Sequence, residues 1–390
     1  MRLPCAFPGA FLLSAALLGA VHSHSGRLED LRAFAAAPTP GGPQPGALIP
    51  NFRLTDHQGV TRELFYESTA RAVVLVFTAR GSARALPTAA ALRDLRARFP
   101  ASEVVIWQVD STAGADPAAL LAEQTLFNND TPVLRDEAQL LASELGVTRE
   151  LETFVLTAGP GATLLYRGPL DDAPPGTLQA PGRRWAAEAV AAHLAGRRPE
   201  PAAVEMPAAA PRLALPAVPD LDYSSAVAPI VQRRCVACHV PDGIAPHAYT
   251  RHADLASRAD AIRGTLLTRR MAPWHADSSH GVWANGVALP PLEAATLHGW
   301  VKAGAPRGTG PDPLTTVRPA PADGWELGPP DLILTIPTQS IPATGTIDYV
   351  YSTVNLPFAE ERWVRAAVVQ PAIPGSSITP SSLRGRSSTC

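Results

Sequence analysis

The N-terminal half of the chain alternates short apolar runs with stretches of helical spacing. Residues 71–77 and 103–109 are rich in β-branched residues and predict buried strands. Residues 87–99 predict a helix with a proline at its start. The remaining predicted elements are a helix at 137–145 stopped by Gly146, strands at 152–156 and 162–166, and a helix at 185–195. This alternation predicts an α/β domain over 46–197 with a mostly parallel sheet.

The pattern changes beyond residue 197. Residues 198–219 carry six prolines among alanines and predict a semi-rigid linker. Residues 220–309 favour a compact helical domain, with helices expected at 225–234 and 291–303. The predicted packed faces of these two helices are Val227, Ile230 and Val231, and Leu292, Ala295, Leu297 and Trp300, with Gly304 ending the second helix.

The C-terminal region turns to β character. Strands are expected within residues 324–370, at 331–336, 346–354 and 362–369. Residues 305–323 are rich in proline and glycine and predict a linker before them.

The N-terminus has the pattern of an export signal. Arg2 precedes an apolar run at 10–20, and small residues follow it. Residues 1–24 are therefore predicted to be a cleaved signal peptide. A membrane anchor is the alternative, but the run has about half of the ~20 residues that span a bilayer. We expect a periplasmic or secreted protein with no membrane span after cleavage.

Composition narrows the function further. Hydrophobic residues make up 46% of the 390 residues, which excludes a wholly disordered chain. Charged residues are 17% and the net charge is -2, whereas a nucleic-acid-binding protein is normally basic. No nucleic-acid partner is expected. The four cysteines, Cys5, Cys235, Cys238 and Cys390, are too few for a disulfide scaffold of this size.

The strongest chemical signal is C-x-x-C-H at Cys235, Cys238 and His239. Two thiols three residues apart on one helical turn can both reach the vinyl groups of one porphyrin, and the adjacent imidazole can then bind the iron. A thioredoxin-like C-x-x-C does not need the histidine, and a zinc site needs further ligands that no other cysteine of this segment supplies. The motif therefore predicts covalently bound haem c, with His239 as an iron ligand.

A second iron ligand is expected at Met271, the one methionine after Met206. A thioether raises the reduction potential of iron and suits reversible electron transfer. Alternatively, Met271 packs in the core and binds no iron. His275, His280 and His298 are the rival candidates for the second ligand. The neighbouring Arg269 and Arg270 either reach the haem propionates or form a solvated surface.

The same stretch resembles a known module. APIVQRRCVACH, GIAPHAY, LLTRRMAPWHAD, GVWANGVAL and LHGWVKAGAPRG, all within 221–309, are similar to the cytochrome c part of exported bacterial proteins. Those proteins join a redoxin domain, a haem c domain and a copper type II ascorbate-dependent monooxygenase-like domain. The resemblance implies an all-α, class I-like cytochrome c fold and places the axial methionine at Met271, with Ala272 replacing a proline of the family pattern.

Residues 46–172 resemble the redoxin module of those proteins through PNFRLTDHQG, AVVLVF and LLYRGPLDD, which implies a thioredoxin-like fold. Ala79 and Ser82 stand at the family's two cysteine positions, and Leu151 stands at that of its cis-proline. No cysteine lies between Cys5 and Cys235. We therefore expect no thiol chemistry in this domain and predict a structural or docking role. Ser82 as a nucleophile is a remote alternative, since no His/Asp pair is evident around it.

Residues 324–371 resemble the start of the monooxygenase-like module, which implies the beginning of a β-sandwich. No histidine follows His298, so this region cannot supply the family's copper ligands. We attribute residues 371–390 to a shift of reading frame near Gln370.

Together these features predict an exported c-type cytochrome that transfers single electrons between unidentified protein donors and acceptors, fused to a redox-inactive thioredoxin-like domain. No catalytic residue is predicted, and an electron carrier is favoured over an enzyme. One alternative is a fragment of a haem- and copper-dependent monooxygenase-like enzyme, inactive for lack of copper ligands. A binding protein with a haem sensor is a third.

Overall fold

The computed structural model describes residues 41–114, 116–174, 177–213, 221–241, 243, 245–271, 283, 286, 288–316, 329–338, 340, 350–360 and 362–364. The predicted signal peptide 1–24 and tail 371–390 lie outside these residues, as do Cys5 and Cys390. Within the described ranges, no helix is both apolar enough and long enough to cross a bilayer.

The chain divides into two compact units. The first unit takes its described residues from 1–218 and 260–298, and the second takes them from 219–259 and 299–390. The predicted cytochrome c domain over 220–309 thus contributes to both units. Its boundaries, and its assignment to the cytochrome c class, stay predictions.

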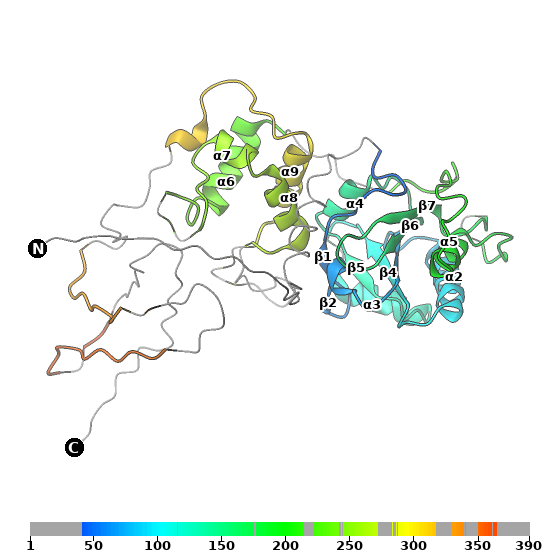
Figure 1. Cartoon of the computed structure of the whole chain (residues 1–390), viewed down its shortest axis with the longest axis horizontal. Coiled ribbons are helices and arrows are strands. Elements are labelled where there is room, and N and C mark those ends of the chain that lie inside the picture. The colour runs from blue at the N-terminus through cyan, green and yellow to red at the C-terminus, as the bar shows by residue number, and fades with distance from the viewer. Residues whose placement is uncertain are drawn as a thin grey trace, which may run out of the picture. The chain divides into compact units, whose positions relative to one another are not determined.

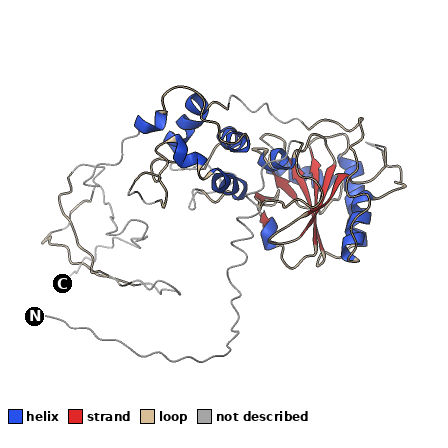
Figure 2. Cartoon of the chain, turned by 45° about the horizontal axis from the view of Figure 1, so that its top comes forward, coloured by secondary structure: helices blue, strands red, loops and turns tan. Residues whose placement is uncertain are grey.

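A five-stranded sheet forms the centre of the first unit (Figures 1 and 2). Its order is β5-β4-β3-β6-β7. The strands are β3 (Ala72–Thr78), β4 (Val104–Asp110), β5 (Val133–Arg135), β6 (Glu152–Thr157) and β7 (Leu164–Pro169). The pairs β3–β4 and β4–β5 are parallel, whereas β3–β6 and β6–β7 are antiparallel. The prediction of a mostly parallel sheet is therefore wrong, because the short turn between β6 and β7 makes a hairpin and a hairpin is antiparallel.

Helices cover both faces of this sheet (Figure 2). They are α2 (Ala85–Arg98), α3 (Pro117–Leu126), α4 (Leu140–Leu145) and α5 (Trp185–Leu194). Leu92 and Leu95 of α2 share one core with Val190 of α5, Val74 of β3 and Ile106 of β4. The order β3-α2-β4, followed by the β6–β7 hairpin and α5, is a thioredoxin-like α/β fold, as predicted.

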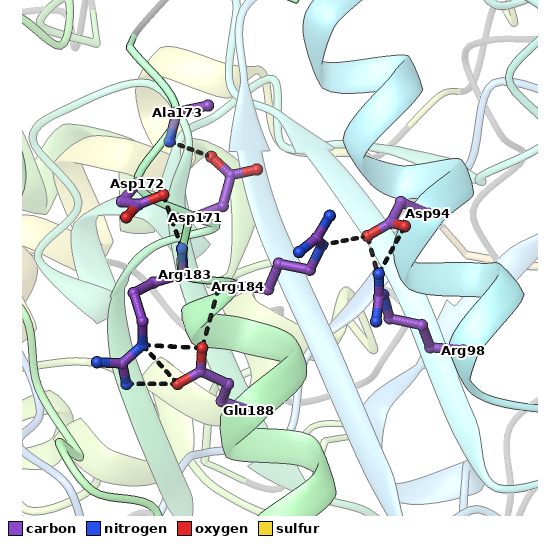
Figure 3. A network of polar contacts seen from close by, with 8 residues as sticks. All are labelled: Asp94, Arg98, Asp171, Asp172, Ala173, Arg183, Arg184 and Glu188. Atoms are coloured by element: carbon purple, nitrogen blue, oxygen red, sulfur yellow. Dashed lines mark hydrogen bonds and ion pairs between the residues drawn. The ribbon is translucent and has the colours of Figure 1, made fainter. Parts of the chain in front are cut away.

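Polar contacts connect α2 to the start of α5 (Figure 3). Asp94 of α2 accepts hydrogen bonds at 2.9 Å from both Arg98 and Arg184, and Arg184 immediately precedes α5. Arg183 pairs with Glu188 one turn into that helix. Hydrogen bonding by Arg98 is the main reason that the pKa of Asp94 lies below its usual value. These contacts are partly exposed, so the apolar core between the helices contributes more to stability than they do.

Sequence patterns found most elements of this domain and missed several others. The predicted strands and helices of this domain are confirmed, and no end is shifted by more than three residues. Helix α4 begins only at Leu140, because Gln139 is in the left-handed conformation, and it ends as predicted at Gly146, whose φ is +66°. The unpredicted elements are α3, β5, and a hairpin of β1 (Arg53–Thr55) and β2 (Thr61–Glu63).

The predicted linker 198–219 is described as far as Leu213, and this part is anchored on the first unit. Leu213 donates a backbone hydrogen bond to Thr148, and Val204 donates one to Arg167 on β7. Ala210 and Leu213 are buried. These residues therefore do not form the extended polyproline II spacer that their composition predicted. The reason is that the side chains of Ala210 and Leu213 are buried.

The second unit has an aromatic core. Its elements are η2 (Tyr223–Val227), α6 (Ala228–Arg234), α7 (His252–Ala256) and η4 (Pro313–Thr316). Tyr223 lies 5.9 Å from Trp300 and 4.8 Å from His252, measured between ring centroids. Asp312 accepts hydrogen bonds at 2.7 Å from the Tyr223 hydroxyl and the His252 backbone N–H. The predicted apolar face of the first helix here, Val227, Ile230 and Val231, is confirmed as buried.

Two helices were predicted differently or not at all. Helix α8 (Ala259–Thr268) had no prediction and lies, from Asp260 on, in the first unit. Helix α9 (Pro291–Lys302) was predicted, and it contributes to both units. Leu297 and Trp300 of α9 are buried as expected, but Leu292 is 60% exposed, because it lies in the first turn of the helix rather than on its packed face.

The predicted β region is described only in part, and the expected strands at 346–354 and 362–369 lie partly outside the described residues. The described residues 329–338, 340, 350–360 and 362–364 contain no strand. Large apolar side chains such as Ile333 and Trp363 are exposed there. The prediction of a strand at 331–336 is wrong, and the reason is physical: a strand needs neighbours to complete its hydrogen bonds and cover its apolar face.

Candidate functional site

The C-x-x-C-H sequence folds as a continuation of α6. Cys235 follows the last helical residue, and its N–H donates to the Val231 carbonyl at 2.8 Å. The N–H groups of Cys238 and His239 both donate to the Cys235 carbonyl, at 3.2 and 3.0 Å. The two thiols and the imidazole therefore come from one tight turn, as the spacing predicted. Cys235 and Cys238 form no disulfide, and both are partly exposed.

The imidazole of His239 is held by groups on the loop that follows. Its Nδ1 lies 2.7 Å from the His247 carbonyl oxygen, and its ring stacks on Tyr249 with centroids 4.3 Å apart. A carbonyl can only accept, so Nδ1 carries the proton and Nε2 has the lone pair. Burial lowers the pKa of His239, which favours the neutral ring. A neutral imidazole, oriented through its other nitrogen, is the form that binds a metal.

The backbone closes tightly over this turn. The Ala245 N–H donates to the Cys238 carbonyl at 3.1 Å, and Tyr249 N–H donates to the His239 carbonyl at 2.8 Å. A Cβ atom at Gly243 would lie 2.6 Å from the Cys238 oxygen. Glycine is therefore required at 243 for the loop to approach the motif this closely.

These residues fit a covalent haem. The turn offers two thiols outside any disulfide and one neutral imidazole whose lone-pair nitrogen is fixed by a hydrogen bond. Across the described residues, no three or more His, Cys, Asp and Glu side chains are grouped to hold a metal ion.

Met271 belongs to the first unit, and the motif belongs to the second. The methionine follows the end of α8 and is 47% exposed, so it does not fill a gap in the core. Of the rival ligands, His298 is 1% exposed and its Nε2 lies 3.1 Å from Glu144, which occupies that nitrogen. His275 and His280 lie outside the described residues.

The arginines before Met271 have protein partners. Arg270 pairs with Glu63 at 2.6 Å. The backbone carbonyl of Arg269 accepts a hydrogen bond from Arg53 at 2.7 Å. Both contacts join the end of α8 to the β1–β2 hairpin. The prediction that this arginine pair reaches haem propionates is therefore less favoured for Arg270 than a role in the first unit.

In the thioredoxin-like fold, two carboxylates lie close to Ser82, which stands at one of the family's cysteine positions. Ser82 lies just before α2, and its hydroxyl donates to Glu150 at 2.7 Å. Glu123 accepts from the Gly81 N–H at 2.9 Å. Ser82, Glu123 and Glu150 line a small pocket together with Leu151. Two carboxylates at this place would raise the pKa of a thiol, the reverse of what thiol chemistry needs.

Leu151 occupies the position predicted for it beside this cleft. Its φ is +64°, and its N–H donates to the Phe77 carbonyl of β3 at 2.7 Å. The peptide bond before it is trans, since the one cis bond among the described residues precedes Pro201. The Ser82 environment also contains no histidine among its described lining residues, so a nucleophilic serine lacks a base.

Sequence reasoning missed a buried charged cluster in the first unit. Arg263 of α8 donates from Nε to Glu144 of α4 at 3.0 Å, and His298 of α9 contacts the same carboxylate. Burial alone would raise the pKa of Glu144, but the hydrogen bonds from His298 and Arg263 and the charge of Arg263 lower it to about 2. These residues are far apart in the sequence, and no local pattern indicated their pairing.

Comparison with known proteins gives similarity for one part of the chain. A hypothetical protein from Sinorhizobium meliloti 1021 has 19% identity, with 44% of this chain and 93% of that chain covered and a TM-score of 0.37. The peroxidoxin BcpB from Mycobacterium tuberculosis has 21% identity, with 31% of this chain and 82% of that chain covered and a TM-score of 0.27. The thioredoxin domain of a thiol-disulfide oxidoreductase from Bacteroides vulgatus has 11% identity, with 32% of this chain and 88% of that chain covered and a TM-score of 0.28. No family model matches the chain, and no curated protein matches it.

Proposed function

We propose that this protein is an exported c-type cytochrome that carries single electrons. Haem c would be bound through Cys235 and Cys238, with His239 and Met271 as the two ligands of its iron. The haem, when bound, supplies a centre that gains and loses one electron. The residues of the chain would attach the haem, orient the His239 imidazole and set the reduction potential.

The observation that carries the proposal is the orientation of His239. Its Nδ1–H is committed to the His247 carbonyl at 2.7 Å, and Tyr249 stacks on its ring. This leaves Nε2 as the ligating atom in a side chain that cannot easily rotate. Such outer contacts raise the basicity of a ligating histidine and hold its ring in place. A structural histidine with no ligand would gain little from a fixed lone pair.

The thioredoxin-like domain has a non-catalytic part in this proposal. Ser82, Glu123 and Glu150 make its cleft unsuited to a thiolate, and no cysteine is present between Cys5 and Cys235. We therefore propose an electron carrier rather than an enzyme. Its redox donor and acceptor would be other exported proteins, because the predicted signal peptide directs the chain to the periplasm or beyond.

The test is expression of the full chain with haem-maturation machinery, followed by visible spectroscopy and a potentiometric titration. The proposal expects the spectrum of a low-spin c-type haem and a reversible one-electron curve. His239→Ala should lose the low-spin spectrum, while the matched variant His193→Ala, near the C-terminal end of α5 in the first unit, should retain it. A colourless wild-type protein would refute the proposal.

A further inference from the structure

The end of helix α8 is held in an unusual conformation immediately before Met271. Arg269 has a φ of +50°, in the left-handed region that favours glycine. Its N–H donates to the Leu266 carbonyl, and the Arg270 N–H donates to the Thr265 carbonyl. This is a Schellman-type helix end built on a non-glycine residue. An arginine in this conformation persists only where surrounding contacts hold it.

Two contacts from the β1–β2 hairpin hold it. Arg53 on β1 donates to the Arg269 carbonyl at 2.7 Å, and Glu63 at the end of β2 pairs with Arg270 at 2.6 Å. Glu63 is itself buried and is oriented by Asn51, whose side-chain nitrogen donates to it at 2.7 Å. Asn51 and Arg270 thus hold the same Glu63 oxygen, so the hairpin contacts the end of α8 through an oriented carboxylate.

The rest of α8 is fixed within the same unit. Arg263 and Glu144 are both almost fully buried and form a charged hydrogen-bonded pair, and His298 completes it. A buried ion pair is costly to separate, because each partner would keep an unpaired charge. The α8 helix is therefore tied to the thioredoxin-like fold at its middle and again at its C-terminal end, one residue before Met271.

From these contacts we infer that Arg53 and Glu63 are positioning residues for Met271. The inference rests on the proposed function, in which Met271 binds the haem iron. The thioredoxin-like fold without thiols then has a role: its hairpin sets the direction in which the chain leaves α8 and so restrains the sulfur. A methionine at the start of an unrestrained loop would exchange easily for another ligand.

The test uses the full-length holoprotein and two variants, Glu63→Gln and Arg53→Met. Both variants keep the size of the side chain but lose its charge. We expect both to keep covalent haem, to weaken the sulfur-to-iron charge-transfer band of the ferric form, and to bind carbon monoxide faster in the ferrous form. Their reduction potentials should fall, since thioether ligation raises the potential. Arg53→Lys, which can still donate to the Arg269 carbonyl, should recover part of the band.

A matched control is Glu152→Gln. Glu152 is a buried carboxylate of the same fold and pairs with Arg167 at 2.7 Å, but it lies on β6. This variant should lose stability without a change in the charge-transfer band or the potential. Amide hydrogen exchange of residues 265–271 gives an independent readout and should accelerate in the Glu63 and Arg53 variants only.

The outcomes separate the two proposals. A wild-type protein without haem refutes the proposed function. A wild-type haem with the sulfur band, together with unchanged bands and unchanged exchange in both folded hairpin variants, refutes the positioning role alone. If Met271→Ala leaves the spectrum of the haem protein unchanged, then the axial assignment of Met271 and its positioning by the hairpin are both wrong.

Discussion

The cleft around Ser82 contains no cysteine, whereas the turn around Cys235 contains two. In the cleft, the thioredoxin-like framework is intact, but a serine and two glutamates line it. In the turn, five consecutive residues keep both thiols and an oriented imidazole. The apolar core maintains this fold without any thiol in the cleft. Covalent haem attachment, in contrast, depends on a few side chains at fixed spacing.

The largest expected effect is the loss of both motif thiols. Cys235→Ala/Cys238→Ala should abolish covalent haem, because no other cysteine lies near the motif in the sequence. Haem staining of a denaturing gel measures this directly. Ser82→Ala is the matched control in the other region and should leave the stain unchanged. Covalent haem in the double variant would show that the two regions were assigned wrongly.

The next effect concerns the stability of the first unit. Glu144→Ala should cost about 3–5 kcal/mol of unfolding free energy, because it removes a buried carboxylate that accepts hydrogen bonds from both Arg263 and His298. Urea unfolding followed by tryptophan fluorescence measures it. An effect no larger than that of the exposed variant Glu188→Ala would contradict the importance of the cluster.

The same residue predicts a pH dependence. The folded-state pKa of Glu144 is about 2, below its usual 4.5, so its stabilisation is complete above pH 4.5 and is lost as the pH falls from 4.5 towards 2. In Glu144→Gln, this acid-side loss should be smaller than in the wild type. Equal slopes of unfolding free energy against pH over this range would contradict the assignment.

A smaller effect tests the close approach of the loop to the motif. Gly243→Ala places a Cβ 2.6 Å from the Cys238 oxygen, and relieving this overlap should cost about 1–3 kcal/mol. The yield of haem-bearing protein should fall accordingly. In Gly182→Ala the nearest atom is the end of the Asp172 side chain at 3.2 Å, which can move, so its yield should stay near that of the wild type.

The smallest effect sharpens the comparison by returning a thiol to the cleft. In holoprotein carrying Ser82→Cys, Glu150 should hold the pKa of the new thiol high, because its carboxylate disfavours the thiolate. Adding Glu150→Gln should lower the pKa of this thiol by about one unit, which raises the alkylation rate at neutral pH by roughly tenfold. Peptide mass spectrometry of the alkylated site gives the rate. No difference between the single and double variants would show that Glu150 does not control this site.

The sequence predicted those features that depend on neighbouring residues in the chain. Strands β3 and β4 were evident from their apolar runs, and the Cys235 turn from its spacing. The direction of β6 relative to β3 was not, since it depends on how the sheet is completed. The contacts of Glu144 with Arg263, and of Glu63 with Arg270, join residues more than a hundred positions apart. Periodicity has no information on such pairs.

The central claim is that the motif at 235–239 attaches haem, and intact mass spectrometry of the exported full-length protein tests it most directly. We predict a polypeptide heavier by one haem group, with neither Cys235 nor Cys238 accessible to alkylation after denaturation. A polypeptide of unmodified mass, with both thiols alkylated, would contradict it.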